Sequence, residues 1–193
     1  MCVADRTRPR RRPRRKGGTR SDGERRQLAY ASRHGAAALP ATGDRALLLC
    51  DGGSRGNPGP AAIAAVLLAP GGALLESRSE AIGRATAAEA EYRAILLGLR
   101  LAANHGADPL EVRSDSRLAI AAVEGTVPGD GGLAALVREI RTAAGGLSGV
   151  RWRWHPRGDN EVADGLVRQL LWQTESGPAH GPMIADRPDP PSD

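Results

Sequence analysis

The stretch ALLLCDGGSRGNPGPAAIAAVLLA at residues 46–69 decides the fold. It contains two apolar runs, Ala46–Cys50, which ends at Asp51, and Ala61–Ala69. The segment between the runs is rich in glycine and proline and predicts a turn that joins two strands, the first ending at Asp51. After another Gly-rich turn, residues 73–82 give a third extended segment. Three strands separated by short turns predict an antiparallel meander.

Beyond the third strand the apolar spacing becomes helical. Thr86 can cap a helix over residues 86–104, in which Ile95 and Leu99 recur on one face. The remaining predicted elements are a strand at 110–114, helices at 116–123 and 133–144, a strand at 150–154 and a helix at 160–172. The order βββαβα(α)βα predicts an α/β fold with helices packed on a five-stranded mixed sheet.

The net charge of +5 is unevenly distributed. Residues 1–30 hold eleven Lys and Arg against three acids, so the rest of the chain carries a net charge of −3. Residues 1–44 and 174–193 are rich in Arg, Pro and Gly without sustained periodicity, and we predict that both are disordered. Residues 45–173 then form one folded domain. The basic tail is either an electrostatic tether to nucleic acid or a solubilising segment.

The two cysteines and the apolar content exclude several classes of protein. Cys2 and Cys50 make no disulfide framework, and we expect Cys50 to pack in the core. The sequence has no apolar run of about 18 residues that would span a membrane. The charged N-terminus is not followed by an apolar segment, as a secretory signal would be. We therefore expect a cytoplasmic protein.

Four acids stand where predicted strands end or predicted helices begin. Asp51 and Asp115 end the first and fourth strands, while Glu91 and Asp164 lie in the first turns of the first and last helices. If the first and fourth strands are neighbours, all four acids can meet. Clustered acids repel one another unless a cation lies among them, and oxygen ligands without Cys or His favour Mg²⁺ or Mn²⁺ over zinc. Spacing alone leaves open that these are ordinary surface acids.

Local sequence around each acid resembles the type 1 ribonuclease H family. The similar segments are DGGSRGNPGPAAIAAVL at 51–67, TAAEAEYRAILLGLRLA at 86–102, EVRSDSRLAI at 111–120 and PRGDNEVADGL at 156–166. They occur in the family's order and cover nearly all of the predicted domain. The resemblance implies the RNase H-like fold and a catalytic domain at 45–173. It also implies an endonuclease that cuts the RNA strand of RNA–DNA hybrids with two Mg²⁺ or Mn²⁺ ions.

The resemblance also implies roles for the acids. Asp51 would bridge both ions, Glu91 and Asp115 would bind the ion on the side of the attacking water, and Asp164 would bind the other. Many relatives have a histidine near His155 that assists proton transfer or product release. Members with the Pro-Arg-x-x-Asn pattern commonly have an apolar residue there, so a structural histidine is an equal alternative.

Substrate contacts are implied for the Gly-rich segment and for two hydroxyl side chains. The glycines would let the backbone approach the nucleic acid, with substrate contacts from Gly53, Ser54 and Asn57. Asn57 would face the minor groove of the hybrid, where 2′-hydroxyls mark RNA. Thr86 and Ser116 match a pair that grips a phosphate of the DNA strand. The expected partner is an RNA–DNA hybrid, with a monomeric chain, no membrane and no obligate protein partner.

The sequence is also compatible with other functions. Family members usually have Asn-Asn where this chain has Ala87-Ala88, which favours a nuclease with relaxed or different nucleic-acid selectivity. A non-catalytic nucleic-acid-binding module is a further alternative, although four intact acids speak against it. Trp152 and Trp154 could stack on bases, but their alternation with arginine favours packing on a sheet face. Some relatives fuse this module to a phosphatase, and we expect no second activity here.

Overall fold

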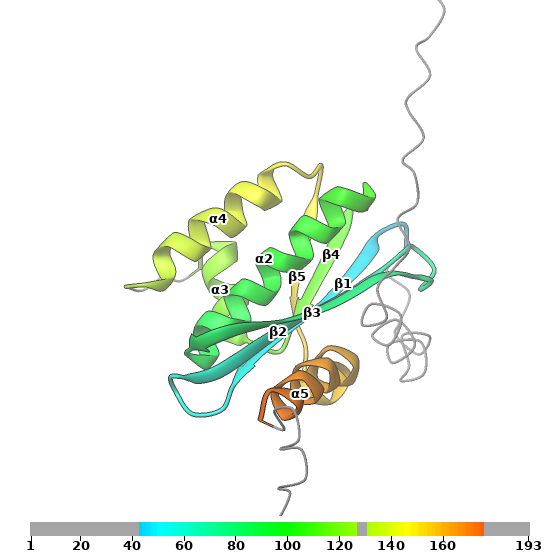
Figure 1. Cartoon of the computed structure of the whole chain (residues 1–193). Helices are drawn as coiled ribbons and strands as arrows, with labels where there is room; N and C mark the ends of the chain where they lie inside the picture. Colours follow the sequence, from blue (N-terminus) through cyan, green and yellow to red (C-terminus); the bar gives the residue numbers. More distant parts are fainter. Residues whose placement is uncertain (1–42, 127–130, 176–193) are drawn as a thin grey trace, which may run out of the picture.

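A computed structural model describes residues 43–126 and 131–175, which form a five-stranded mixed sheet with helices on both faces (Figure 1). The described elements are β1 (Ala46–Ser54), β2 (Gly59–Leu68), β3 (Leu74–Ala85), α2 (Ala87–His105), β4 (Leu110–Ser114), α3 (Arg117–Glu124), α4 (Leu133–Gly145), β5 (Val150–Trp154), the 3₁₀ turn η2 (Arg157–Asp159) and α5 (Glu161–Glu175). The predicted fold class is confirmed.

The sheet has the strand order β3-β2-β1-β4-β5. β1 is antiparallel to β2 and parallel to β4, and β4 is parallel to β5. The first and fourth strands are therefore neighbours, as the clustering of the acids requires. Because β1, β4 and β5 run in the same direction, their carboxyl ends meet at one edge of the sheet.

Each face of the sheet has its own apolar core. Leu48 and Cys50 of β1 belong to the cluster that lies under α2, α3 and α4. Leu47 and Leu49 point to the opposite face and join the cluster under α5, which lies alone on that side in Figure 1. Because β1 is covered on both faces, it is a continuous apolar run without polar alternation. Cys50 is fully buried, as predicted.

Glycines allow α2 to lie very close to β1 at two points. A Cβ atom on Gly52 would lie 2.2 Å from the carbonyl carbon of Ala90 and 2.5 Å from the backbone nitrogen of Glu91. Further along the helix, a Cβ atom on Gly98 would lie 2.5 Å from a methyl group of Leu48. The contact at Gly52 therefore positions Glu91 against the strand that carries Asp51.

The expectation that Asp51 ends the first strand was wrong. β1 continues to Ser54, and its register pairs Asp51 with Ala64 and Ser54 with Ala61 on β2. The turn is limited to the few residues between Ser54 and Gly59. Gly52, which follows Asp51, is needed because α2 packs directly against β1 at this position, and it does not form a turn.

The ends of the predicted domain lie at the limits of the described residues. Most of the two segments predicted to be disordered, 1–44 and 174–193, falls outside the described residues, although α5 itself continues to Glu175. Between α3 and β5 the described part of the chain holds one helix, α4. None of the described helices has the length and apolar character needed to cross a membrane.

Candidate active site

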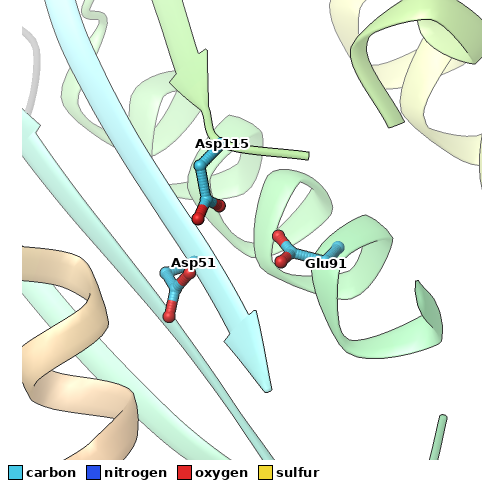
Figure 2. A group of neighbouring side chains, drawn as sticks. All are labelled: Asp51, Glu91 and Asp115. Carbon is cyan, nitrogen blue, oxygen red and sulfur yellow. The ribbon is translucent and has the colours of Figure 1, made fainter. Parts of the chain in front are cut away.

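Three of the four predicted acids lie close together near the carboxyl end of β4, beside the neighbouring strand β1 (Figure 2). Asp51 comes from β1, Glu91 from the second turn of α2, and Asp115 directly follows β4. One carboxylate oxygen from each lies within 4.8 Å of the others. The three side chains thus come from three different elements and point toward a common centre.

Local interactions fix the backbone that carries Glu91 and Asp115. Thr86 caps α2, because its hydroxyl accepts a hydrogen bond from the Glu89 backbone nitrogen at 3.1 Å. The Ser114 hydroxyl accepts from the Ser116 backbone nitrogen at 3.1 Å and so closes the turn around Asp115. The Trp154 indole nitrogen donates to the Asp115 carbonyl oxygen at 3.0 Å. The carboxylates are therefore held by the fold rather than by one another.

Burial and mutual repulsion raise the pKa values of two of these acids. The pKa of Asp51 rises to about 7, first because the side chain is buried and then because of the charges on Asp115 and Asp164. The pKa of Glu91 rises to about 9, again mainly through burial and then through Asp51 and Asp115. A hydrogen bond from the Gly52 backbone opposes part of the shift at Glu91. The site therefore disfavours its own full ionisation in the absence of a cation.

One oxygen of each of these three carboxylates lacks a hydrogen-bond partner among the described residues. Asp51 Oδ1, Glu91 Oε2 and Asp115 Oδ1 are buried and accept no hydrogen bond from any residue that the structure describes. A buried ionised oxygen without a partner is costly, and a bound cation removes that cost. Because all the donors are carboxylate oxygens, the site fits a hard divalent ion such as Mg²⁺ or Mn²⁺.

Asp164 lies beside this group without joining it. It stands in the first turn of α5 and forms an ion pair with Arg168, and its charge contributes to the raised pKa of Asp51. A second ion pair involves Asp115. The Nε atom of Arg157 in η2 donates a hydrogen bond to Asp115 Oδ2 at 3.0 Å. Neither arginine was among the predicted site residues. They supply positive charge next to the carboxylates and lower the pKa of Asp51.

The comparison with known proteins agrees with this geometry. The profile of the family described as "Reverse transcriptase-like" matches residues 49–170. Ribonuclease HI of the archaeon Halobacterium salinarum is 37% identical over 133 residues, a match that covers 68% of this chain and 67% of that protein. The chain belongs to the type 1 ribonuclease H family.

Solved structures of this family superpose on the chain. The crystal structure of RNase H1 from Halobacterium salinarum has a TM-score of 0.62 at 36% identity and covers 66% of this chain and 97% of that one. LC11-RNase H1, solved in complex with an RNA/DNA hybrid, has a TM-score of 0.65 at 29% identity and covers 68% and 100%.

A mycobacterial relative is much longer than the matched region. The bifunctional protein Rv2228c of Mycobacterium tuberculosis is 35% identical over 129 residues, which is 66% of this chain but 35% of that protein.

Two residues predicted to contact substrate lie together at the start of α2. The side chain of Asn57, which is exposed, accepts a hydrogen bond from the Ala87 backbone nitrogen at 3.2 Å. Asn57 is thereby held beside Thr86. Ser116 caps α3 in the same way that Thr86 caps α2, with its hydroxyl accepting from the Ala119 backbone nitrogen at 3.3 Å.

The remaining predicted contacts lie along the end of β1. Gly53 and Ser54 are half-buried, and a Cβ atom on Gly53 would lie 3.2 Å from a methyl group of Val167 on α5. The Ser54 hydroxyl donates to the Gly56 carbonyl oxygen at 2.7 Å. Gly53 thus packs against α5, and the Ser54 hydroxyl hydrogen is used within the turn.

His155 follows β5 and is not part of the carboxylate group. Its exposed fraction is 8%, and neither ring nitrogen bonds to a residue that the structure describes. Burial lowers its pKa first, and the positive charge of Arg113 lowers it further. Its backbone nitrogen donates to the Ser114 carbonyl oxygen at 3.2 Å, which joins it to the strand leading to Asp115.

Asn160 was not among the predicted site residues, although it lies within the PRGDNEVADGL segment. Asn160 is fully buried, and its side-chain nitrogen donates to the Cys50 carbonyl oxygen at 2.9 Å. It thereby ties the start of α5 to β1 at the residue before Asp51. The signal in the sequence was an asparagine directly before the helix that carries Asp164.

The two tryptophans of β5 have different environments. Trp152 packs against the core under α2, as the alternation predicted. Trp154 is 39% exposed, and the Arg117 guanidinium lies 3.9 Å from the centre of its ring. Packing on the sheet face therefore accounts for Trp152 but not for Trp154.

The raised pKa values predict how stability depends on pH. Because the folded-state pKa values of Asp51 and Glu91, about 7 and about 9, exceed the unfolded values, the folded state binds more protons in between. The free energy of unfolding of the metal-free protein should therefore fall as pH rises from about 5 to 9. Thermal melts across this range, in chelator and in Mg²⁺, measure the effect. The stabilisation by Mg²⁺ should grow with pH, and a gain that stays flat would contradict this account.

Proposed function

We propose that this protein is a ribonuclease H that cuts the RNA strand of RNA–DNA hybrids with divalent metal ions. The observation that carries the proposal is the convergence of Asp51, Glu91 and Asp115, with one oxygen from each within 4.8 Å of the others. Family membership and the likeness to a relative solved with an RNA/DNA hybrid support it. A binding module would gain nothing from burying carboxylates that repel one another.

The four acids would hold two Mg²⁺ ions in the assignment that the family resemblance implies. Asp51 would contact both ions, Glu91 and Asp115 one, and Asp164 the other. Ions held there would supply activation of a water for in-line attack on the phosphodiester and stabilisation of the leaving 3′-oxygen. Asp164 would turn from its ion pair with Arg168 to take its place.

The remaining residues would position the nucleic acid. The hydroxyls of Thr86 and Ser116 each accept a bond from their own helix and keep a hydrogen to donate to a phosphate oxygen. The Asn57 amide nitrogen stays available for the minor groove, because its oxygen bonds to Ala87. These contacts would set the register of the hybrid over the carboxylates.

A nuclease with relaxed selectivity is the second candidate function. Ala87 and Ala88 stand where family members usually have two asparagines, and Ala88 is exposed at the start of α2. An alanine side chain cannot form hydrogen bonds with the groups that distinguish RNA from DNA. The chain would then cut further duplexes besides the hybrid.

Cleavage of one labelled duplex in three forms, RNA–DNA, RNA–RNA and DNA–DNA, tests both candidates. Each form is incubated with Mg²⁺, Mn²⁺ or chelator, using wild type and Asp115→Asn. We expect metal-dependent cutting of the RNA strand of the hybrid that is lost in Asp115→Asn. Cutting of the other duplexes would support the relaxed nuclease. Binding without cutting in either metal would overturn both proposals.

A further inference from the structure

We propose that the face of β4 and β5 on the α5 side of the sheet binds the phosphate backbone of nucleic acid that flanks the cut site. The inference rests on the proposed function, and it assigns a role to arginines that lie outside the carboxylate site. Its main residues are Arg151 and Arg153 of β5, which lie beside Glu111 and Arg113 of β4.

Strand geometry places these side chains on one face. Trp152 packs into the core under α2, so its neighbours Arg151 and Arg153 point to the opposite side of the sheet. The parallel register pairs Arg151 with Glu111 and Arg153 with Arg113. The four side chains therefore form a compact block on the α5 side.

No described helix covers this block. α5 packs on β1, β2 and β3, and its apolar side chains contact the cluster built on those strands. The Arg151 side chain is 48% exposed, and Arg153 is exposed as well. As far as residues 43–126 and 131–175 are concerned, the face is therefore open to a partner.

The block carries more positive charge than it neutralises. Glu111, which is buried, pairs with Arg113 at 2.7 Å and more loosely with Arg151 at 3.5 Å. Arg153 forms no hydrogen bond or ion pair with any residue in the described ranges 43–126 and 131–175. The block therefore holds three guanidinium groups and one carboxylate, which pairs with two of them. Since the chain after residue 30 has a net charge of −3, this surplus is a local feature.

The block continues directly into the carboxylate site. β4 leads from Arg113 to Asp115 within two residues, about 7 Å along a strand. β5 leads from Arg153 to His155 and then to Arg157, whose guanidinium pairs with Asp115. A nucleic-acid strand that leaves the carboxylates across the ends of β4 and β5 would meet Arg153 first and Arg151 next. Neutralising its phosphates would release counterions and strengthen binding.

Salt-dependent binding of a labelled RNA–DNA hybrid tests this surface. Binding is measured in chelator, so that no strand is cut, for wild type and for Arg151→Gln/Arg153→Gln. If both arginines contact phosphates, the slope of log K against log salt should become shallower by about 1.8 in the double variant. The matched control is Arg100→Gln/Arg138→Gln, which removes two exposed arginines from α2 and α4 on the other side of the sheet. Its slope should equal that of wild type.

Hybrids extended on one side or the other of a central segment provide a second readout. Wild type should gain affinity from extension on one side only, and the double variant should lose that gain. Equal slopes for wild type and the double variant, or equal losses in both variant pairs, would overturn the proposal. Thermal melts confirm that each variant folds. Failure of the proposed function would appear separately, as salt-dependent binding by a wild type that cuts no hybrid in Mg²⁺.

Discussion

Asp51→Asn should abolish cleavage while making the metal-free protein more stable. Asp51 is buried at the centre of the carboxylate group, and its pKa of about 7 reflects burial and repulsion from Asp115 and Asp164. The neutral amide of asparagine removes that repulsion. It also replaces the charged carboxylate that would bind the metal. Mutation of a residue that only hydrogen-bonds to a metal ligand can lower activity by up to about 100-fold. Since Asp51 would itself be a ligand, we expect activity to fall by more than that.

The stability gain should be largest above pH 7, where wild-type Asp51 is ionised. In chelator, the melting temperature should rise by about 2–4 °C for each kcal/mol of repulsion relieved. In Mg²⁺ the advantage should disappear, because wild type gains stability from the ion and the variant does not. The matched control is Asp159→Asn, which changes an exposed aspartate in η2. A variant that loses activity and stability together would show that Asp51 supports the fold rather than a metal site.

Gly52→Ala should have the second-largest effect, on both activity and stability. The added Cβ atom would lie 2.2 Å from the Ala90 carbonyl carbon, a backbone atom that cannot rotate away. The first turns of α2 must then move from β1 and carry Glu91 with them. Overpacking of this kind costs about 1–3 kcal/mol, and a shift of about 1 Å at a catalytic group can lower the rate about 100-fold.

Gly98→Ala separates the two effects. Its Cβ atom would also meet β1, at 2.5 Å from a Leu48 methyl group, but it lies about two turns of helix away from Glu91. We expect this variant to lose some stability, because the fully buried Leu48 side chain must shift, and to retain most of its activity per folded molecule. Denaturant unfolding measures the first quantity, and single-turnover cleavage at saturating Mg²⁺ measures the second. Equal activity losses in both variants would mean that α2 moves as a unit and that Gly52 has no special role.

The sequence was sufficient to predict the order of the elements, because apolar spacing changes clearly from strands to helices. It was also sufficient to find the acids that converge, because each lies beside a local pattern of the family. It misplaced the end of β1, since the same glycine that favours a turn in sequence permits the approach of α2 in space.

Contacts between distant segments could not be predicted in this way. Arg157 pairs with Asp115, and Asn160 with the carbonyl of Cys50, only because η2 and α5 return to the end of β1. Nothing in the spacing of these residues encodes their partners. The unequal burial of Trp152 and Trp154 has the same origin, because the core ends between them and α3 supplies Arg117 beyond it.

The parallel pairing of β1 with β4 also determines when the protein becomes a nuclease during its synthesis. The meander of β1, β2 and β3 leaves the ribosome first and can pair locally, but β4 cannot join β1 until all of α2 has emerged. Asp164 arrives later still, on the last helix. With Asp164 in the role proposed for it, the metal site of a nascent chain would be complete only after almost the whole domain has left the ribosome.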